Sequence, residues 1–272
     1  MESRSEERGE EMSDLIPQGL SGVQSASDIT QVDRLKLILL GEPGAGKSWC
    51  SCTGRKPVYV ADFDDRSASI AGKKDIFIKS YVDRDPSLPH AWSDFESDLG
   101  TMEYAKQKGE LKIKTIALAS LTYMLKAAQY QLVKDIPSLS RSARISSHSY
   151  IIPQGWDAVN YAQRMMEGIL NRLFELGIDI IAEAHIRREK DATSTEKNPV
   201  FTDKWTIEPQ NMKMLLPAFN ERWLVTNDNG FRVKTKPAYD FNAVTALHID
   251  AEEDADITKI LVKHAANVAA GK

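Results

Sequence analysis

The sequence predicts an α/β fold in which helices flank a mainly parallel central sheet. Several apolar runs are continuous and are bounded by charged residues or glycine, as is typical of parallel strands buried on both faces. Segments with helical spacing separate these runs, and such alternation favours a parallel sheet within one domain. With 272 residues and 42% hydrophobic content, the chain is long enough to bury one substantial core.

The first half of the chain shows this alternation. Leu35–Leu40 is apolar throughout and leads into a glycine-rich turn, which predicts a buried strand. The segment from a cap near Ser87 to the stop signal at Gly109 predicts a helix. Further strands are expected at Pro57–Ala61, Asp75–Val82 and Ile113–Ala119, and a further helix at Leu121–Lys134.

Two long polar segments separate the remaining elements. Residues 136–155 are rich in serine and residues 186–210 are mostly polar, so both are expected to be irregular loops. Between them, apolar residues at helical spacing over Trp156–Leu173 predict an amphipathic helix, and Ile178–Ala184 predicts a fifth strand. Two apolar runs around the turn signal Asn-Asp-Asn-Gly predict a C-terminal antiparallel hairpin over residues 221–236.

The two ends of the chain differ from this core, which is expected over residues 31–250. Residues 1–30 are charged and polar, so we expect a disordered or docking tail there. Residues 251–272 are expected to form a helical tail. Its acids suit the start of a helix, where negative charge is favoured by the helix dipole; they are Glu252, Glu253, Asp254 and Asp256.

Composition argues against several classes of protein. A net charge of −4 and a pI of about 5.8 give no overall basic field for nucleic acid. No apolar run reaches the roughly 20 residues of a membrane span, and the charged N-terminus is unlike a secretory signal. Cys50 and Cys52 are too close in sequence to staple a fold, so we expect packing residues in a reducing cytoplasm. The sequence therefore predicts a cytoplasmic protein with no membrane partner.

The segment "GEPGAGKS" (Gly41–Ser48) follows the first strand and matches the Walker A pattern G-x-x-x-x-G-K-[ST]. Its glycines permit close approach of the backbone, whose N–H groups and following helix N-terminus hold phosphates. Lys47 is expected to reach the β- and γ-phosphates, and Ser48 to ligate Mg²⁺. The absence of an N-K-x-D motif favours ATP over GTP. The residues expected to contact the nucleotide are Gly41, Glu42, Pro43, Gly44, Ala45, Gly46, Lys47, Ser48 and Trp49.

Three acids follow the second strand, in "YVADFDDR". Alternation along a strand sends Asp62 and Asp64 to the same side, and the carboxyl end of a parallel strand can face a nucleotide. We therefore assign Asp64 as the acid that activates water and Asp62 as a support for Mg²⁺ or its waters. The alternative is that these acids, with Asp65, are solubilising residues of a turn.

The fourth strand lacks the acid that a Walker B motif carries. "TIALAS" has the apolar residues but places Ala119 where the aspartate belongs, followed by Ser120. An alanine cannot hold a metal-bound water. Asp62 substitutes for the missing acid, or Ser120 does so weakly, or hydrolysis is slow or lost. The sequence thus predicts a nucleotide-binding ATPase whose turnover depends on which of these alternatives holds at Ala119.

The order of these motifs resembles that of the RecA-like phage ATPases, which include phage single-strand annealing proteins remotely related to the RecA recombinases. The likeness spans roughly residues 35–190, through "GEPGAGKS", "VYVADFDD", "TIALASLTYM", "QGWDAVN" and "DIIAEAHIRRE". It implies a RecA-like P-loop NTPase fold and, if a phage encodes the chain, the cytoplasm of a bacterial host. It gives the catalytic role to Asp64 and makes His185 the sensor of the γ-phosphate. The alternative for His185 is a hydrogen-bonded histidine at a strand end.

The resemblance also implies a homo-oligomer, as a ring or filament, on single-stranded DNA. The two polar segments correspond to DNA-binding loops, with ordinary solvated loops as the alternative. Their candidate cations are Arg141, Arg144, Arg187, Arg188, Lys190, Lys197 and Lys204, and the candidate stacking residues are Tyr150, Phe201 and Trp205. Lys234 and Lys236 are implied to reach the γ-phosphate of a neighbouring subunit; the alternative is that they protect an edge strand.

Three functions follow from these features. The first is an ATP-dependent protein that acts on single-stranded DNA in phage-type recombination, annealing or replication. The second, which Ala119 favours, is a nucleotide-gated accessory or loader that hydrolyses ATP weakly and contacts single-strand-binding or other replication proteins. The third is a small-molecule or nucleotide kinase, for which the sequence offers neither a lid nor an acceptor pocket beyond the loops.

Overall fold

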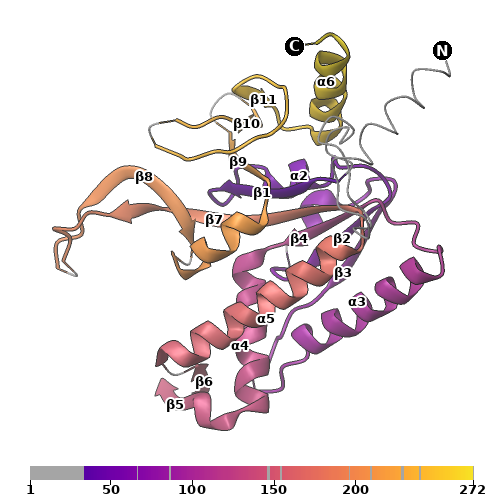
Figure 1. Ribbon diagram of the computed structural model, residues 1–272. Coiled ribbons are helices and arrows are strands. Elements are labelled where there is room, and N and C mark those ends of the chain that lie inside the picture. Colours follow the sequence, from indigo (N-terminus) through magenta and orange to yellow (C-terminus); the bar gives the residue numbers. More distant parts are fainter. Residues whose placement is uncertain are drawn as a thin grey trace, which may run out of the picture. The chain divides into compact units, whose positions relative to one another are not determined.

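The computed structural model describes residues 34–271 except 66, 86, 146–147, 154, 196, 209, 228–229 and 239, so the tail predicted at residues 1–30 lies outside the described residues. Over that part of the chain, the strands join in a nine-stranded sheet with the order β11-β10-β9-β1-β7-β4-β2-β3, and β8 pairs with β7 (Figure 1). A separate two-stranded sheet joins β5 and β6.

The predicted strands and helices form close to their expected bounds. The parallel strands are β1 (Lys36–Gly41), β2 (Val58–Asp62), β3 (Ile76–Ser80), β4 (Thr115–Ala119), β7 (Asp179–Lys190) and β9 (Glu221–Thr226). The antiparallel strands are β5 (Ser140–Ile145), β6 (His148–Pro153), β8 (Phe201–Glu208), β10 (Arg232–Lys234) and β11 (Glu252–Asp254). The helices are α2 (Lys47–Ser51), α3 (Ala91–Gln107), α4 (Leu121–Asp135), α5 (Gly155–Glu175) and α6 (Ile257–Ala269), with 3-10 turns at Ser67–Ile70, Pro137–Leu139 and Gln210–Ala218.

The order of the parallel strands determines which residues meet at the phosphate loop. Strand β1 pairs in parallel with β7 on one side and β9 on the other. Strand β4, which ends at Ala119, pairs with β7 and not with β1. Because β7 lies between β1 and β4, a side chain on β7 is one strand closer to the loop than any side chain on β4.

The central strands β1, β2, β4 and the first half of β7 are buried on both faces, as their continuous apolar runs predict. The same prediction is wrong for the similar run at β3, because β3 lies at the edge of the sheet and is mostly exposed. Alternate residues of β1, β4 and β7 pack with α3, α4 and α5, which lie together on one face of the sheet (Figure 1). The other face packs under the end of α2, where Cys52 joins a smaller cluster with Val58, Val60, Ala117 and Ala119. Cys50 and Cys52 are free and buried, so the prediction that they are packing residues is confirmed.

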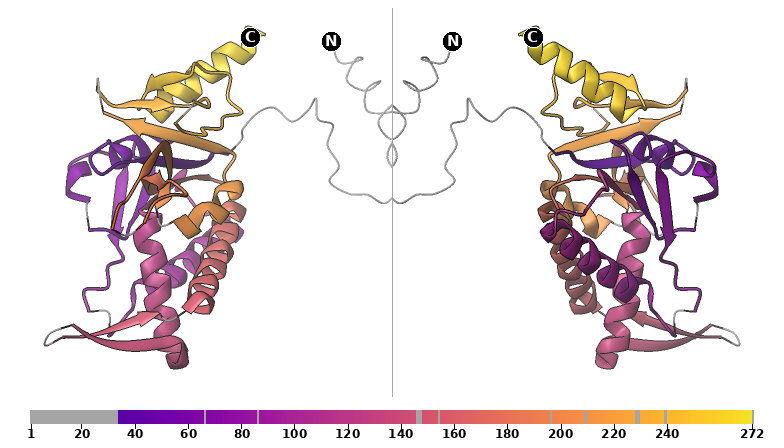
Figure 2. Two further views of the ribbon diagram at one scale, coloured as in Figure 1. Left: turned by 90° about the vertical axis from the view of Figure 1, so that its left-hand side faces the viewer. Right: turned by 90° about the vertical axis from the view of Figure 1, so that its right-hand side faces the viewer.

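Neither polar segment is the irregular loop that the sequence predicts. Ser140–Ile145 and His148–Pro153 pair as the β5–β6 hairpin, which Figure 2 shows at the end of α4 and α5 away from the main sheet. Strand β7 continues past His185 to Lys190 and pairs with β8, so residues 186–190 and 201–208 form a two-stranded arm. The prediction failed because backbone pairing outside a core needs no apolar alternation, and that alternation was the only strand signal available.

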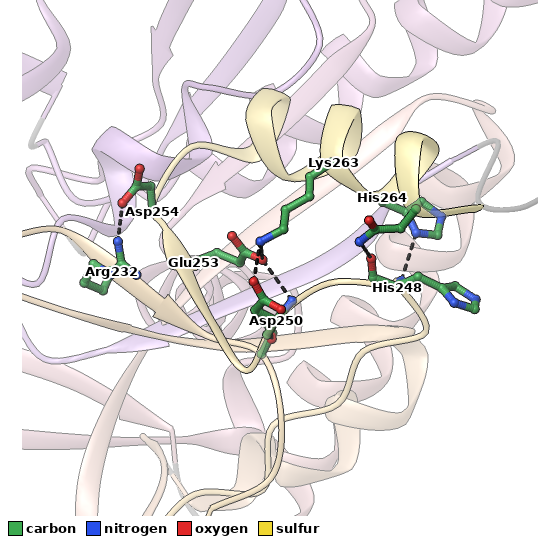
Figure 3. Close-up of polar contacts among 9 residues, drawn as sticks. Arg232, His248, Asp250, Glu253, Asp254, Lys263 and His264 are labelled. Atoms are coloured by element: carbon green, nitrogen blue, oxygen red, sulfur yellow. Dashed lines mark hydrogen bonds and ion pairs between the residues drawn. The ribbon is translucent and has the colours of Figure 1, made fainter. Parts of the chain in front are cut away.

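The acid cluster near the C-terminus is also placed differently. Glu252–Asp254 form β11, which pairs with β10, and α6 begins only at Ile257. Asp256 does lie at the helix start, where its side chain accepts a hydrogen bond of 3.1 Å from the backbone N–H of Lys259. Arg232 on β10 explains the strand, because it forms ion pairs across the two strands with Glu252 and with Asp254, the second of which Figure 3 shows.

No helix within the described ranges is long and apolar enough to cross a lipid bilayer.

Helix α6 is expected to pack less stably below about pH 6.5, because His264 must be neutral in the folded chain. His264 is 5% exposed, and its Nδ1 accepts the backbone N–H of His248 at 2.9 Å (Figure 3). Burial and the neighbouring His248 ring lower the pKa of His264 from its usual 6.5. The unfolded chain therefore binds the proton more readily, and this contribution to stability is present above pH 6.5 and lost as the pH falls through the folded-state pKa.

The measurement is the thermal midpoint from pH 8 to 5, together with hydrogen exchange of the α6 amides. His264→Asn retains an acceptor close to the position of Nδ1 and does not titrate, so its midpoint should vary less with pH. His90→Asn, which removes an exposed histidine paired with Asp94, serves as the control. Equal pH profiles for wild type and His264→Asn would contradict the assignment.

Candidate nucleotide-binding site

The phosphate loop links β1 to α2 and requires glycine at two positions. Gly44 and Gly46 have φ angles of +83° and +95°, which are left-handed conformations that other residues adopt only with strain. At Gly46 there is also no room for a side chain, because a Cβ would lie 2.4 Å from Cδ1 of Phe231. The loop therefore depends on glycine for its shape as well as for access to a ligand.

Gly46→Ala is expected to reduce both stability and ATP affinity more than Gly44→Ala does. Both variants carry the left-handed strain of about 1–2 kcal/mol. Only Gly46→Ala adds a clash, since the Cβ built at Gly44 has no atom within 4 Å. Thermal unfolding and ATP titrations of the two variants test this difference. Equal losses in the two would show that the Phe231 ring moves away without cost.

Lys47 lies inside the loop with its charge buried. Its side chain is 6% exposed, and Nζ donates hydrogen bonds of 2.9 Å to the carbonyl oxygens of Gly41 and Glu42. These carbonyls hold the ammonium beside the backbone that would receive the phosphates. The loop thus presents a buried cation together with backbone N–H groups, as a site for a polyanion requires.

Glu183, in the middle of β7, is a site residue that the sequence analysis missed. It is 2% exposed, and its two carboxylate oxygens accept hydrogen bonds from Ser48 Oγ at 2.8 Å and Ser51 Oγ at 2.6 Å. A charged residue within the apolar run "IDIIAEA" was the available signal, because such residues are rarely buried without partners.

The electrostatics of Glu183 connect it to the predicted catalytic groups. Burial raises its pKa to about 7, against the hydrogen bonds from Ser51 and Ser48 and the charge of Lys47, which lower it. The negative charge of Asp64 raises the same pKa further. Lys47, Ser48, Asp64 and Glu183 therefore belong to one electrostatic site.

Asp62, Ala119 and Glu183 occupy adjacent positions across three strands. Asp62 is paired with Ala119 in the parallel register, and Leu118 is paired with Ala182, so Ala119 lies beside Glu183. Ala119 packs in the smaller cluster beneath α2, the helix whose serines contact Glu183. Asp62 follows Val60 by two residues and so faces the same way. The position without an acid thus has a buried acid on each side.

Asp64 lies near Asp62, but strand alternation is not the reason. Strand β2 ends at Asp62, and Asp64 is in the bend that follows, where its backbone N–H donates to Asp62 Oδ1 at 3.1 Å. Asp64 is partly buried, whereas Asp65 is exposed. The predicted pair is therefore brought together by this hydrogen bond, and the argument from alternation fails at Asp64.

His185 and Ser120 lie at strand ends near the loop. His185 is aligned in the sheet with Gly41, the first residue of the phosphate loop, and its ring meets Tyr123 edge to face at 6.5 Å. Ser120 is 1% exposed, and its hydroxyl has no hydrogen-bond partner among the residues described. Ser120 is the first residue beyond β4, so a polar atom without a partner lies at the end of the strand that lacks the Walker B acid.

A cleft of about 390 Å³ adjoins the outer side of the phosphate loop. It contains Lys234 and Trp205, and its full lining is Glu42, Pro43, Gly44, Ala45, Ile186, Trp205, Leu224, Val225, Thr226, Asn227, Lys234 and Asp240. Lys234 therefore lies beside the loop of its own chain. The alternative of edge-strand protection is wrong, because β11 pairs with β10 and Lys234 is not on an edge; Lys236 lies beyond β10 and is exposed.

The β7–β8 arm places cations opposite aromatic residues. Arg188 pairs with Trp205 across the two strands, and Lys190 pairs with Phe201. The guanidinium of Arg188 lies 5.4 Å from the centre of the Trp205 ring, and Phe201 is 50% exposed. Arg187 is partly buried next to them, while Lys197 and Lys204 are exposed. Of Arg141, Arg144 and Tyr150 only the backbone is described, in β5 and β6.

Comparison with known proteins identifies a family. A family model described as an AAA domain matches residues 33–220, which is more than half of the chain. No curated protein has a matching sequence. Among solved structures, the KaiC-like protein PH0186 from Pyrococcus horikoshii OT3 is 9% identical, covers 72% of this chain and 74% of its own, and has a TM-score of 0.36, too low to bear on function. With the mainly parallel sheet, the family match confirms the predicted α/β P-loop NTPase fold.

Proposed function

The chain belongs to the AAA domain family, and we propose that it is an ATP-binding, RecA-like protein that acts on single-stranded DNA in phage-type recombination, annealing or replication. A nucleotide-binding P-loop domain follows from the family. The observation that carries the proposal is the buried Lys47 ammonium inside a glycine-shaped loop, in one electrostatic site with Glu183 of β7 and Asp64 beyond the end of β2. ATP is the proposed ligand, with Mg²⁺ as its metal.

The residues at the loop fit a magnesium nucleotide. No three His, Cys, Asp or Glu side chains cluster as a metal site in the described part of the chain. Mg²⁺ does not need such a cluster, because it binds through one or two protein oxygens, water and the substrate's phosphates. Ser48 and Asp62 are the predicted ligands. When bound, the metal would neutralise charge on the phosphates.

Each predicted residue has a task that its position supports. Lys47 would exchange its carbonyl contacts for contacts with the β- and γ-phosphates. Asp64, beyond the end of β2, would orient a water molecule and accept its proton. His185 is aligned with the start of the loop, and the same strand continues to Arg188 and Lys190. A shift at His185 on loss of the γ-phosphate would therefore be transmitted along β7 into the arm.

The arm is the proposed DNA-binding element. Its alternating cations and aromatic rings suit a single strand, because phosphates attract the cations and any base can stack on a ring. The side chains on the β5–β6 hairpin, Arg141, Arg144 and Tyr150, are proposed to assist. Assembly into a ring or filament, with Lys234 and Lys236 reaching a neighbouring subunit, is part of the same proposal.

Arg188→Ala with Lys190→Ala is expected to weaken binding of oligo(dT) and reduce its salt dependence. Loss of two phosphate contacts should lower the slope of log K against log salt by about 1.4, since each contact on a single strand contributes about 0.7. Lys112→Ala with Lys114→Ala removes the same charge elsewhere on the surface and is the control. Salt-titrated fluorescence anisotropy measures both. Identical slopes for the two double variants would show that the arm does not bind the oligonucleotide.

A second candidate is a nucleotide-gated accessory or loader protein, which Ala119 favours because the Walker B acid is missing. ATP hydrolysis with and without single-stranded DNA separates the candidates. DNA-stimulated turnover supports the first proposal, and tight ATP binding with no DNA effect supports the second. Transfer of phosphate to a small acceptor would favour a kinase instead.

A further inference from the structure

We propose that Glu183 supplies the carboxylate that β4 lacks at Ala119, so that the metal site of this chain is completed from β7. This inference rests on the proposed binding of ATP at Gly41–Ser48. It assigns a metal-site residue outside the Walker motifs, and it explains how the loop can retain a magnesium nucleotide without an acid at the end of β4.

The first argument is direct contact with the predicted metal ligand. Glu183 Oε2 lies 2.8 Å from Ser48 Oγ, the hydroxyl expected to bind Mg²⁺. In P-loop NTPases the metal is held by this hydroxyl and by the Walker B aspartate. Glu183 can act in place of that aspartate, because it touches the hydroxyl from the strand next to β1.

The second argument comes from the register of the sheet. Neighbouring strands lie about 4.8 Å apart, so residues beside each other in register present their side chains to the same region. Ala119 has Asp62 on one side and Glu183 on the other. Of these two acids Glu183 is nearer the loop, because β7 separates β4 from β1. The carboxylate of Glu183 therefore lies one strand closer to the phosphate loop than an acid at position 119 would.

The third argument is the positive charge that a buried carboxylate at Glu183 needs once a nucleotide is bound. A buried carboxylate is costly unless its charge is balanced, and apolar replacements of buried ionic groups are often as stable. The hydrogen bonds to Glu183 come from two neutral hydroxyls of α2, the helix that follows the phosphate loop, and the positive charge of the buried Lys47 also stabilises the carboxylate. When ATP binds, Lys47 would turn to the phosphates. A divalent cation beside Ser48 would then provide the balancing charge.

The experiment measures how much Mg²⁺ tightens binding of a non-hydrolysable fluorescent ATP analogue, compared with EDTA. Wild type should bind more tightly with Mg²⁺. In Glu183→Gln, which keeps the size of the side chain, the gain from Mg²⁺ should fall by about 10–100-fold, the usual effect of losing a group that supports a metal site. Binding in EDTA should persist. Mn²⁺ in place of Mg²⁺ gives a direct spectroscopic reading of the bound metal.

Two further variants distinguish a metal role from a packing role. The double variant Ala119→Asp/Glu183→Gln places a carboxylate on β4 instead of β7. The increase in analogue affinity caused by Mg²⁺ should recover in this variant. Glu221→Gln is the matched control: Glu221 is also a fully buried strand glutamate, with hydrogen bonds from Trp223 Nε1 and the backbone N–H of Ala246. In Glu221→Gln, Mg²⁺ should increase the affinity for the analogue as much as it does in the wild type. If Glu183→Gln fails to fold, Glu183→Asp withdraws the carboxylate from Ser48 and is measured instead.

Each outcome is decisive. An undiminished metal gain in Glu183→Gln, with analogue binding intact, overturns the role of Glu183 and leaves the proposed function standing. A reduced gain that the double variant does not recover shows that the loss is structural and also overturns the role. Failure of folded wild-type protein to bind the analogue with or without metal overturns the proposed function, and the role of Glu183 with it.

Discussion

A Lys47→Ala protein is expected to lose most of its affinity for ATP. The Lys47 ammonium is buried in the phosphate loop, 2.9 Å from the carbonyl oxygens of Gly41 and Glu42, so it is already positioned to meet a phosphate. Removing one partner of a buried charge pair costs about 2–5 kcal/mol, which corresponds to roughly 30- to 5000-fold in Kd. Isothermal titration with ATP and Mg²⁺ measures the loss.

The control for Lys47→Ala is Lys56→Ala, which removes the same charge from an exposed residue that contacts the backbone of Lys74. It should bind ATP like the wild type. Circular dichroism should show both variants folded, because neither substitution alters the apolar clusters of the core. Wild-type affinity in Lys47→Ala would remove the basis for placing the phosphates at this loop.

The central parallel strands could be predicted from sequence because they are buried on both faces. Continuous apolar runs such as Leu35–Leu40 and Ile178–Ala184 carry a signal that survives in the linear sequence. The β7–β8 arm and β11 carry no such signal, since their backbones pair while most of their side chains face solvent. Strand pairing of polar segments depends on neighbours distant in the chain, which a local pattern does not reveal.

The candidate site was predicted in part, for a related reason. The phosphate loop is local, and its glycines and Lys47 are recognisable in eight consecutive residues. The residues around Ala119 are distant from one another in sequence, and they lie together only because β7 is positioned between β1 and β4. Asp62 and Asp64 could be predicted because they lie at or just beyond the end of a strand. Glu183 was missed, since it lies inside a strand and contacts Ser48 only because the sheet places β7 next to β1.

An Asp64→Asn protein is expected to hydrolyse ATP about 10²- to 10⁴-fold more slowly than wild type, the range that general acid–base groups contribute. Asparagine has nearly the shape of aspartate and keeps the backbone hydrogen bond to Asp62 Oδ1, but it cannot accept a proton from water. ATP affinity should change little, because Lys47 and the loop are untouched. The measurement is phosphate release with saturating ATP, in the presence and absence of single-stranded DNA.

Asp65→Asn is the control for Asp64→Asn, since it makes the same change at the next residue. Asp65 is exposed and has a φ of +57°, a conformation that asparagine tolerates well, so its rate should match the wild type. Single-turnover measurements are required if Ala119 makes the basal rate slow.

The two variants distinguish the role of Glu183 from that of Asp64. If Glu183 holds the metal and Asp64 activates water, Glu183→Gln loses the gain from Mg²⁺, whereas Asp64→Asn keeps that gain and loses turnover. Equal rates for Asp64→Asn and Asp65→Asn would show that Asp64 does not activate the water. Because Glu183 is buried and touches Ser48 of the loop, it would then be the next group to test for that step.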